Sequence, residues 1–165
     1  AQATAALAND GVMFRPRLVR YIENVNTGER RFVEPEVSSS IPLKKENLDF
    51  IKRAMAGVNI EGTGARAFAG AEYTSAGKTG TSQVIAIKAN EKYVESRVAE
   101  RHRDHALFIA FAPVESPKIA LAVLVENSGF GARAAAPIAR IALDYYLLGK
   151  KPKKAVDDDA SADHD

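Results

Sequence analysis

Apolar residues recur with helical spacing in three stretches of the chain. Residues 2–9 are rich in alanine and end near Gly11, which suits the left-handed conformation that closes a helix. A second helix is expected from Lys45, because apolar residues three and four positions apart define one buried face. The residues of that face are Leu48, Ile51, Met55 and Val58. Gly57 and Asn59 mark its expected frayed end, and the small residues 61–66 are expected to be flexible.

The third helical stretch covers residues 134–148 and is stopped by Gly149. Pro137 is placed early in this helix, where a first turn tolerates proline. The residues predicted to lie on its buried side are Ile138, Ile141, Ala142, Tyr145 and Leu148. The pair Tyr145 and Tyr146 is interpreted as core and rim rather than as a platform for a ligand.

The other regular stretches are predicted to be extended. Residues 17–25 and 30–33 flank a turn and are expected to form a hairpin, whereas residues 35–42 hold two prolines and three serines and are expected to form a loop. The apolar runs 106–112 and 119–125 are typical of strands buried on both faces, and their short connection makes them antiparallel neighbours. The pattern therefore predicts an α/β (α+β) domain in which an antiparallel sheet is flanked by helices.

One further strand, residues 72–87, carries polar residues at its centre, in the order Lys78, Thr79, Gly80 and Thr81. A cation, two hydroxyls and a glycine are unfavourable in a strand unless they face a polar ligand. We interpret this stretch as a binding site in which Lys78 supplies charge, the threonines donate hydrogen bonds and Gly80 allows another backbone to lie close. Strict alternation places Thr79 and Thr81 on one face and Lys78 on the other. Both faces reach one cleft only if the strand forms its wall edge-on or twists locally.

Two motif matches at this strand are interpreted as chance. Gly77-Lys78-Thr79 matches the end of a phosphate-binding loop, but the first glycine of that motif is replaced by Glu72 and no helix pattern follows. Ser75-Ala76-Gly77-Lys78 matches Ser-x-x-Lys, which requires serine and lysine on one helix face. On a strand the same spacing sends them to opposite faces.

Composition and charge argue against several classes of function. The 165 residues suit one domain, and the net charge of +2 is too small to argue for nucleic acid. The chain has no cysteine, and His102 and His105 lack a further ligand set, so no metal or cofactor is expected. The charged residues 88–105 are interpreted as a solvated, partly helical excursion, with a docking surface or flap as the alternative. Residues 150–165 form segregated charge blocks and are expected to be disordered.

The Lys-Thr-Gly motif at residues 78–80 is one of three that occur in penicillin-binding proteins and class A β-lactamases. Its surroundings extend the match: residues 2–16, the stretch SAGKTGTSQV, and the later segments ERHRDHALFIAFAP and IALAVLVENSGFG. These resemble, in order and spacing, the C-terminal third of class B penicillin-binding proteins, in particular the elongation-specific transpeptidases of rod-shaped bacteria. Residues 1–149 are accordingly expected to be the C-terminal portion of a transpeptidase domain.

The resemblance implies a five-stranded antiparallel sheet between helices and a serine-type D,D-transpeptidase. Such enzymes form an acyl-enzyme with the D-Ala-D-Ala end of a peptidoglycan stem peptide, transfer the acyl group to a neighbouring stem, and are trapped by β-lactams. The implied catalytic residues are Lys78, which orients protons and attracts the terminal carboxylate, and Thr81, whose N–H is an oxyanion donor. Thr79, Gly80 and Thr81 would bind substrate.

The chain also departs from the family pattern, because it contains neither a Ser-x-Asn nor a helical Ser-x-x-Lys. The nucleophile is therefore expected upstream of Ala1, and this chain alone is predicted to be inactive. The implied partners are the stem peptide, β-lactams, the upstream half of the same protein and membrane proteins of the elongation complex. The implied location is the periplasmic side of the bacterial inner membrane. The alternatives are a β-lactamase-like or penicillin-sensor domain on the same fold, and a non-catalytic interaction module.

Overall fold

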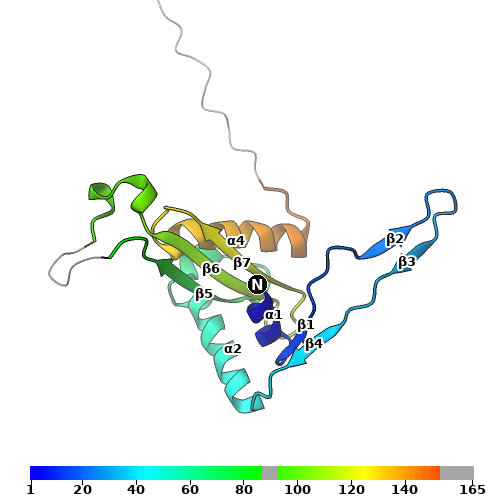
Figure 1. The fold of residues 1–165 in the computed structure, drawn as a ribbon. Coiled ribbons are helices and arrows are strands. Elements are labelled where there is room, and N and C mark those ends of the chain that lie inside the picture. Colours follow the sequence, from blue (N-terminus) through cyan, green and yellow to red (C-terminus); the bar gives the residue numbers. More distant parts are fainter. Residues whose placement is uncertain (87–92, 153–165) are drawn as a thin grey trace, which may run out of the picture.

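A three-stranded antiparallel sheet lies at the centre of the computed structural model, which describes residues 1–86 and 93–152 (Figure 1). Its strands are β5 (Ala76–Ser82), β6 (His105–Ala112) and β7 (Ile119–Val125), in the order β5-β6-β7. Among the described strands, β5 pairs only with β6, so it is an edge of the sheet. Helices cover both faces, which confirms the predicted α/β architecture with an antiparallel sheet.

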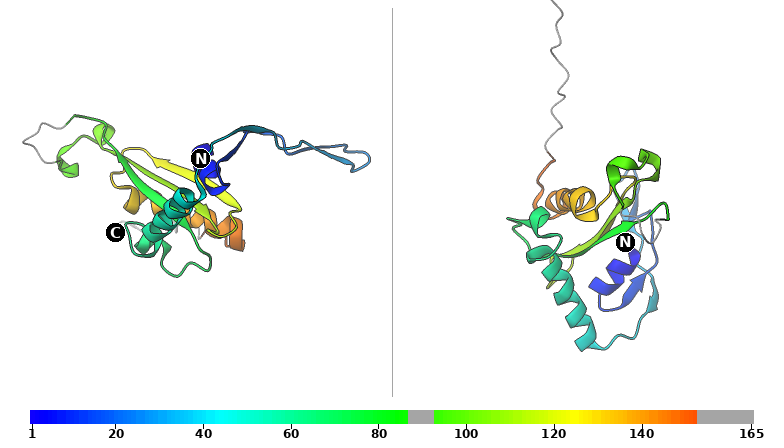
Figure 2. Two further views of the ribbon diagram at one scale, coloured as in Figure 1. Left: turned by 90° about the horizontal axis from the view of Figure 1, so that it is seen from below. Right: turned by 90° about the vertical axis from the view of Figure 1, so that its left-hand side faces the viewer.

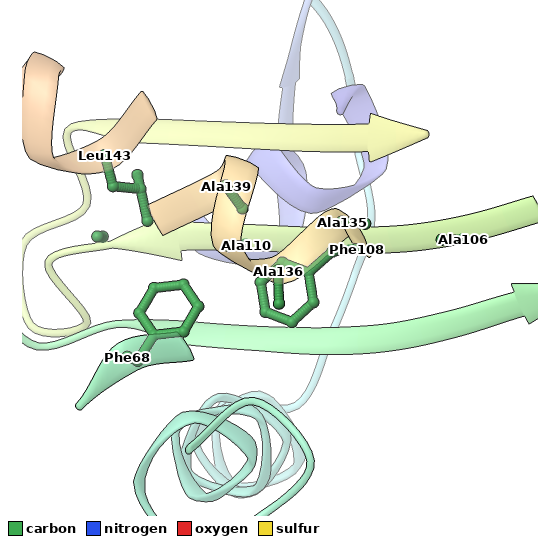
Figure 3. Packing of buried hydrophobic residues seen from close by; sticks show 9 residues of the cluster. Phe68, Ala106, Phe108, Ala110, Ala135, Ala136, Ala139 and Leu143 are labelled. Carbon is green, nitrogen blue, oxygen red and sulfur yellow. The ribbon is translucent and has the colours of Figure 1, made fainter. Parts of the chain in front are cut away.

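Each face of the sheet has its own hydrophobic cluster. On one face, α4 (Gly131–Leu148) and the short α3 (Ala65–Phe68) pack on alternate residues of β6 (Figure 3). Phe68 stacks on Phe108 there, with ring centroids 5.6 Å apart. On the other face, α1 (Gln2–Ala8) and α2 (Lys45–Ile60) pack around Ala76 and Phe111. The sheet is therefore held from both sides near the start of β5.

The predicted buried side of α4 is wrong. Ile138, Ile141 and Tyr145 are 46%, 47% and 57% exposed, and Tyr146 is exposed as well. The residues that face the sheet are Ala135, Ala136, Ala139 and Leu143, all fully buried. Small side chains let the helix approach the bulky Phe108 closely, so size complementarity decides the packed face. The apolar stripe predicted for the core lies on the opposite side.

The ends of α4 also differ partly from the prediction. The helix begins at Gly131, so Pro137 lies in its second turn rather than its first. Gly149 closes it with φ +68°, as expected of a left-handed glycine.

The helix α2 agrees with the predicted start but not with the predicted end. Leu48 and Met55 are buried as expected, whereas Ile51 is 41% exposed. Asn59 is not frayed: it is 6% exposed, and its Nδ2 donates to Ser75 Oγ at 2.9 Å. Helical periodicity finds the helix, but it does not distinguish an apolar face that packs in this chain from one that remains open.

The N-terminal part contains two small antiparallel pairs. The predicted hairpin is present as β2 (Tyr21–Glu23) and β3 (Arg30–Phe32), shorter than expected, and it extends away from the sheet (Figure 2). The serine run predicted as a loop is a strand instead, β4 (Val37–Ser40), which pairs with β1 (Val12–Phe14). Ser38 Oγ donates to the Met13 carbonyl at 3.2 Å, so one hydroxyl of the serine run supports this pairing.

Three further predictions have partial outcomes. The strand β6 is covered on both faces, but β7 is not, because Leu124 is 57% exposed. Short 3₁₀ helices at Glu95–Arg97 and Glu100–His102 confirm that the charged excursion is partly helical where it is described. The stretch 87–92, and the tail from residue 153 onward, lie outside the described residues.

Candidate functional site: the open edge of β5

The strand β5 is anchored at its start and exposed further along. It pairs with β6 in continuous register from Ala76, opposite Phe111, to Ser82, opposite His105. Ala76 and Gly77 are buried, Thr79 and Gly80 are half-buried, and Lys78 and Thr81 are exposed. The predicted extension to Ile87 is wrong in its described part, because the strand ends at Ser82 and Val84 is 39% exposed. The apolar run after Ser82 has no strand partner in the described residues and so adds nothing to the sheet.

The register assigns each polar side chain to a face. Thr79 and Thr81 lie opposite Phe108 and Ala106, which pack under α4, whereas Lys78 lies opposite Ile109, which packs in the cluster of α1 and α2. The alternation expected from the sequence is therefore present. No described strand covers the outer side of β5, and the Lys78 side chain bends to its own strand, where Nζ donates to the Thr79 carbonyl.

Lys78 is a cation without an acidic partner among the described residues. Its Nζ donates to the Thr79 carbonyl oxygen at 2.9 Å, and no carboxylate within residues 1–86 and 93–152 forms an ion pair with it. A lysine at an open strand edge, with its charge uncompensated, creates a local positive potential. The arrangement suits an anionic ligand.

A close backbone approach occurs at Gly80, and Gly131 is the residue that permits it. A Cβ on Gly131 would lie 2.2 Å from the Leu107 carbonyl oxygen and 2.4 Å from the Gly80 carbonyl oxygen. The first residue of α4 therefore lies directly on the β5–β6 pair, in the middle of the polar stretch. This contact sets the distance between the start of α4 and β5.

A polar network holds the segment that leads into β5. Asp144 of α4 accepts from Tyr73 Oη and from Arg140 Nε, both at 2.8 Å. Arg140 also donates to the Ala69 carbonyl at 3.1 Å. Burial, followed by the contact with Asp144, raises the pKa of Tyr73 above its ordinary value, so the phenol stays protonated and remains a donor.

The sequence pointed to the site strand but missed two residues beside it, Thr63 and Asn59. Thr63 Oγ1 lies 2.9 Å from Thr79 Oγ1, and Asn59 bonds Ser75 at the foot of β5. Thr63 belongs to the α2–α3 connection that was predicted to be flexible, and Asn59 belongs to the last turn of α2, which was predicted to fray. The sequence feature that could have indicated Thr63 is a hydroxyl side chain between Gly62 and Gly64, upstream of β5.

The two rejected motif matches are rejected by the structure as well. Ser75 is buried, bonded to Asn59 and outside any helix, so it does not share a helix face with Lys78. The strand continues through Gly77 and Thr79 without a following helix, which is incompatible with a phosphate-binding loop.

The described part of the chain offers neither a metal site nor a membrane-spanning helix. It contains no cluster of three or more His, Asp or Glu residues arranged to hold a metal ion. His105 Nδ1 instead accepts from the Asn127 N–H at 3.0 Å. Within the same residues, no helix has the length and apolar character needed to cross a membrane.

The fold and the polar strand edge define a class of protein. Residues 1–144 match the family model of the penicillin-binding protein transpeptidase domain, and the chain belongs to that family. Within it, the chain is 39% identical over 157 residues to the peptidoglycan D,D-transpeptidase MrdA of Haemophilus influenzae, covering 93% of this chain. It is 36% identical over 151 residues to MrdA of Escherichia coli K12. The chain spans about a quarter of the length of these curated relatives.

Solved structures give the same assignment. Pseudomonas aeruginosa PBP2, in complex with WCK 5153, matches 92% of this chain and 30% of its own, with TM-score 0.67 and 37% identity. Penicillin-binding protein A of M. tuberculosis, an imipenem acyl-enzyme complex, matches 88% of this chain and 29% of its own, with TM-score 0.66 and 26% identity. The resemblance to elongation-type class B proteins, of which PBP2 is the example, is confirmed.

Two Gly→Ala changes in helices should have opposite effects on stability. Gly131→Ala places a methyl group against two backbone oxygens and should destabilise the full-length protein by about 1–3 kcal/mol. Gly57→Ala meets nothing closer than Glu61 Oε1 at 3.9 Å and should stabilise by about 0.5–1 kcal/mol, because alanine favours helix. Thermal or urea unfolding measures both. Equal effects would contradict the close packing of α4 on β5.

Proposed function

We propose that this chain supplies one wall of the active-site cleft of a peptidoglycan D,D-transpeptidase. The observation that carries the proposal is the open edge of β5, which holds two threonines and a lysine that forms no ion pair with a carboxylate of the described residues. Family membership gives the reaction class, since the matching relatives bear the name peptidoglycan D,D-transpeptidase. The substrate would be the D-Ala-D-Ala end of a stem peptide.

In this proposal Lys78, Thr79 and Thr81 bind the terminal carboxylate of the stem peptide. Charge-assisted hydrogen bonds are short and strong, and two hydroxyls with one ammonium suit a two-oxygen anion. Lys78 also orients protons at the reacting serine. The peptide would lie along β5 as an added strand, because the outer backbone groups of an edge strand are unpaired. Gly80 leaves room for the peptide there.

Thr81 has a second proposed role through its backbone. Lys78 Nζ reaches the Thr79 carbonyl oxygen, which supports an outward direction for that carbonyl. Backbone groups of residues two apart in an antiparallel strand point to the same side, so the Thr81 N–H would face the cleft as well. In that position it would stabilise the oxyanion of the tetrahedral intermediate.

The nucleophile and its activating lysine are proposed to lie on parts of the domain outside these residues, because no serine here stands on a helix with lysine three residues later. The complete enzyme would work on the periplasmic side of the inner membrane. A structure of a related Helicobacter pylori PBP2 is a complex with MreC, which supports an elongation-complex partner for this protein too. β-Lactams would acylate it, as imipenem does the M. tuberculosis protein.

Labelling of the full-length protein with a fluorescent penicillin tests the role of β5. Thr79→Val should lower the second-order acylation rate by about 10- to 100-fold, the loss of a hydrogen bond to a charged group. Lys78→Ala should lower it by about 100-fold or more, because charge and proton transfer are lost together. Lys118→Ala, an exposed lysine before β7, is the matched control and should retain the unaltered rate. Unchanged labelling of both site variants would contradict the proposal. Rapid hydrolysis of the acyl-enzyme would favour a β-lactamase-like protein instead.

Separating the chain from the rest of the protein tests where the nucleophile lies. Residues 1–149, purified alone, should take up no labelled penicillin covalently, and co-expression with the upstream part should restore labelling. Gel fluorescence and intact-mass analysis report the adduct. A covalent adduct on the isolated chain would place the reacting group within these residues and overturn the assignment.

A further inference from the structure

We propose that Thr63 is a positioning residue for carboxylate recognition, acting through the hydroxyl of Thr79. The inference rests on the proposed function, because it concerns how the same strand edge binds its anion. The carrying observation is the 2.9 Å contact between Thr63 Oγ1 and Thr79 Oγ1, two side chains sixteen positions apart. Among the described residues, this is the only hydrogen bond formed by either hydroxyl.

The path of the chain explains why Thr63 meets the edge of β5. Upstream, Met55 of α2 packs with Ala76 and Phe111 on one face of the sheet. Downstream, Phe68 of α3 packs on Phe108 on the opposite face (Figure 3). The connection between α2 and α3 therefore passes from one face to the other, and it does so at β5, the edge strand. Thr63 lies on this crossing.

Close packing holds the crossing in one conformation. A Cβ on Gly62 would lie 2.8 Å from Val58 Cα, and one on Gly64 would lie 2.6 Å from Asn59 Oδ1. Asn59 is itself buried and bonded to Ser75. The segment is thus tied to β5 at two positions, through Asn59 at Ser75 and through Thr63 at Thr79.

The crossing makes no backbone hydrogen bond to β5. The described backbone bonds of residues 61–64 stay within α2 and the α2–α3 turn, such as Gly62 N–H to the Gly57 carbonyl and Gly64 N–H to the Val58 carbonyl. The contact from Thr63 is therefore made by its side chain alone, and the crossing occupies none of the backbone groups of β5.

Hydroxyl chemistry sets the direction of the bond when an anion is present. Each threonine hydroxyl has one proton and two acceptor lone pairs. If Thr79 donates its proton to a carboxylate, the bond to Thr63 requires Thr63 to donate and Thr79 to accept. Donation from Thr63 then points the Thr79 proton outward and polarises it, since linked hydrogen bonds strengthen one another.

The test is a double-mutant cycle in the full-length protein, with a penicillin and its methyl ester as probes. Thr63→Val should lower the acylation rate of the free acid by about three- to tenfold, the effect of one neutral hydrogen bond. It should leave the rate of the ester unchanged, because the ester has no anion for Thr79 to bind. Thr63→Ser, which keeps the hydroxyl, should restore the rate with the free acid.

If Thr63 acts through Thr79, the effects of the two substitutions on the acylation rate should not add. The Thr63→Val/Thr79→Val double variant should react with the free acid at the same rate as Thr79→Val alone. Thr27→Val, in the hairpin turn, is the matched control and should change neither probe. Melting temperatures of all variants show whether each is folded.

The outcomes separate this inference from the proposed function. Additive effects, or an equal loss with acid and ester, would overturn the positioning role of Thr63 while leaving the cleft assignment intact. The same conclusion follows if Thr79→Val slows acylation and Thr63→Val does not. Absence of labelling in the unaltered protein would overturn both.

Discussion

The strand β5 has one paired side and one open side, and the rest of the structure depends on this asymmetry. Its inner side is fixed by continuous pairing with β6, and its first residue, Ala76, is completely buried. Its outer side has no strand partner in the described residues. Exposed strand edges are normally covered, charged or kept short, because their free backbone groups can pair with a strand of another molecule. Here the edge carries Lys78, whose charge is one such protection and which, in the proposed function, attracts an anionic ligand.

The helices maintain this edge rather than merely covering a core. Within the polar stretch, Gly131 brings the start of α4 onto the backbone of Gly80. At the near end, Asn59 holds Ser75, and between the two points Thr63 contacts Thr79. A strand held at several points moves little relative to its neighbours. Such rigidity is what a site needs to hold hydrogen-bond donors in a fixed geometry before the ligand arrives.

Much of this architecture was predictable from the sequence, and the failures have physical reasons. The apolar runs of β6 and β7 and the polar centre of β5 stand out, because apolar continuity and its interruption are local properties. The packed face of α4 was predicted wrongly, since alanines fit under Phe108 better than the larger Ile138 or Tyr145. That choice depends on a partner surface distant in sequence. The strand at Ser38 was missed for a similar reason, because it is stabilised by pairing with β1 and not by its own propensity.

The candidate site was also predictable only where the sequence signal is local. Lys78, Thr79 and Thr81 were identified because their chemistry is unusual within a strand. Thr63 was not, because a threonine between two glycines is typical of a turn, and its meaning depends on the crossing between the faces of the sheet. Lys78 and Thr79 lie on opposite faces of β5, and the proposal that both bind one carboxylate depends on β5 being an edge strand.

A crystal structure of the full-length protein acylated by a carboxylate-bearing β-lactam tests the central claim most directly. The account predicts the carboxylate within about 3.2 Å of the Thr79 and Thr81 hydroxyl oxygens. It also predicts the Thr81 nitrogen about 2.7–3.1 Å from the oxygen of the acyl carbonyl. An acyl group bound away from the open edge of β5, with its carboxylate held by other residues, would contradict it.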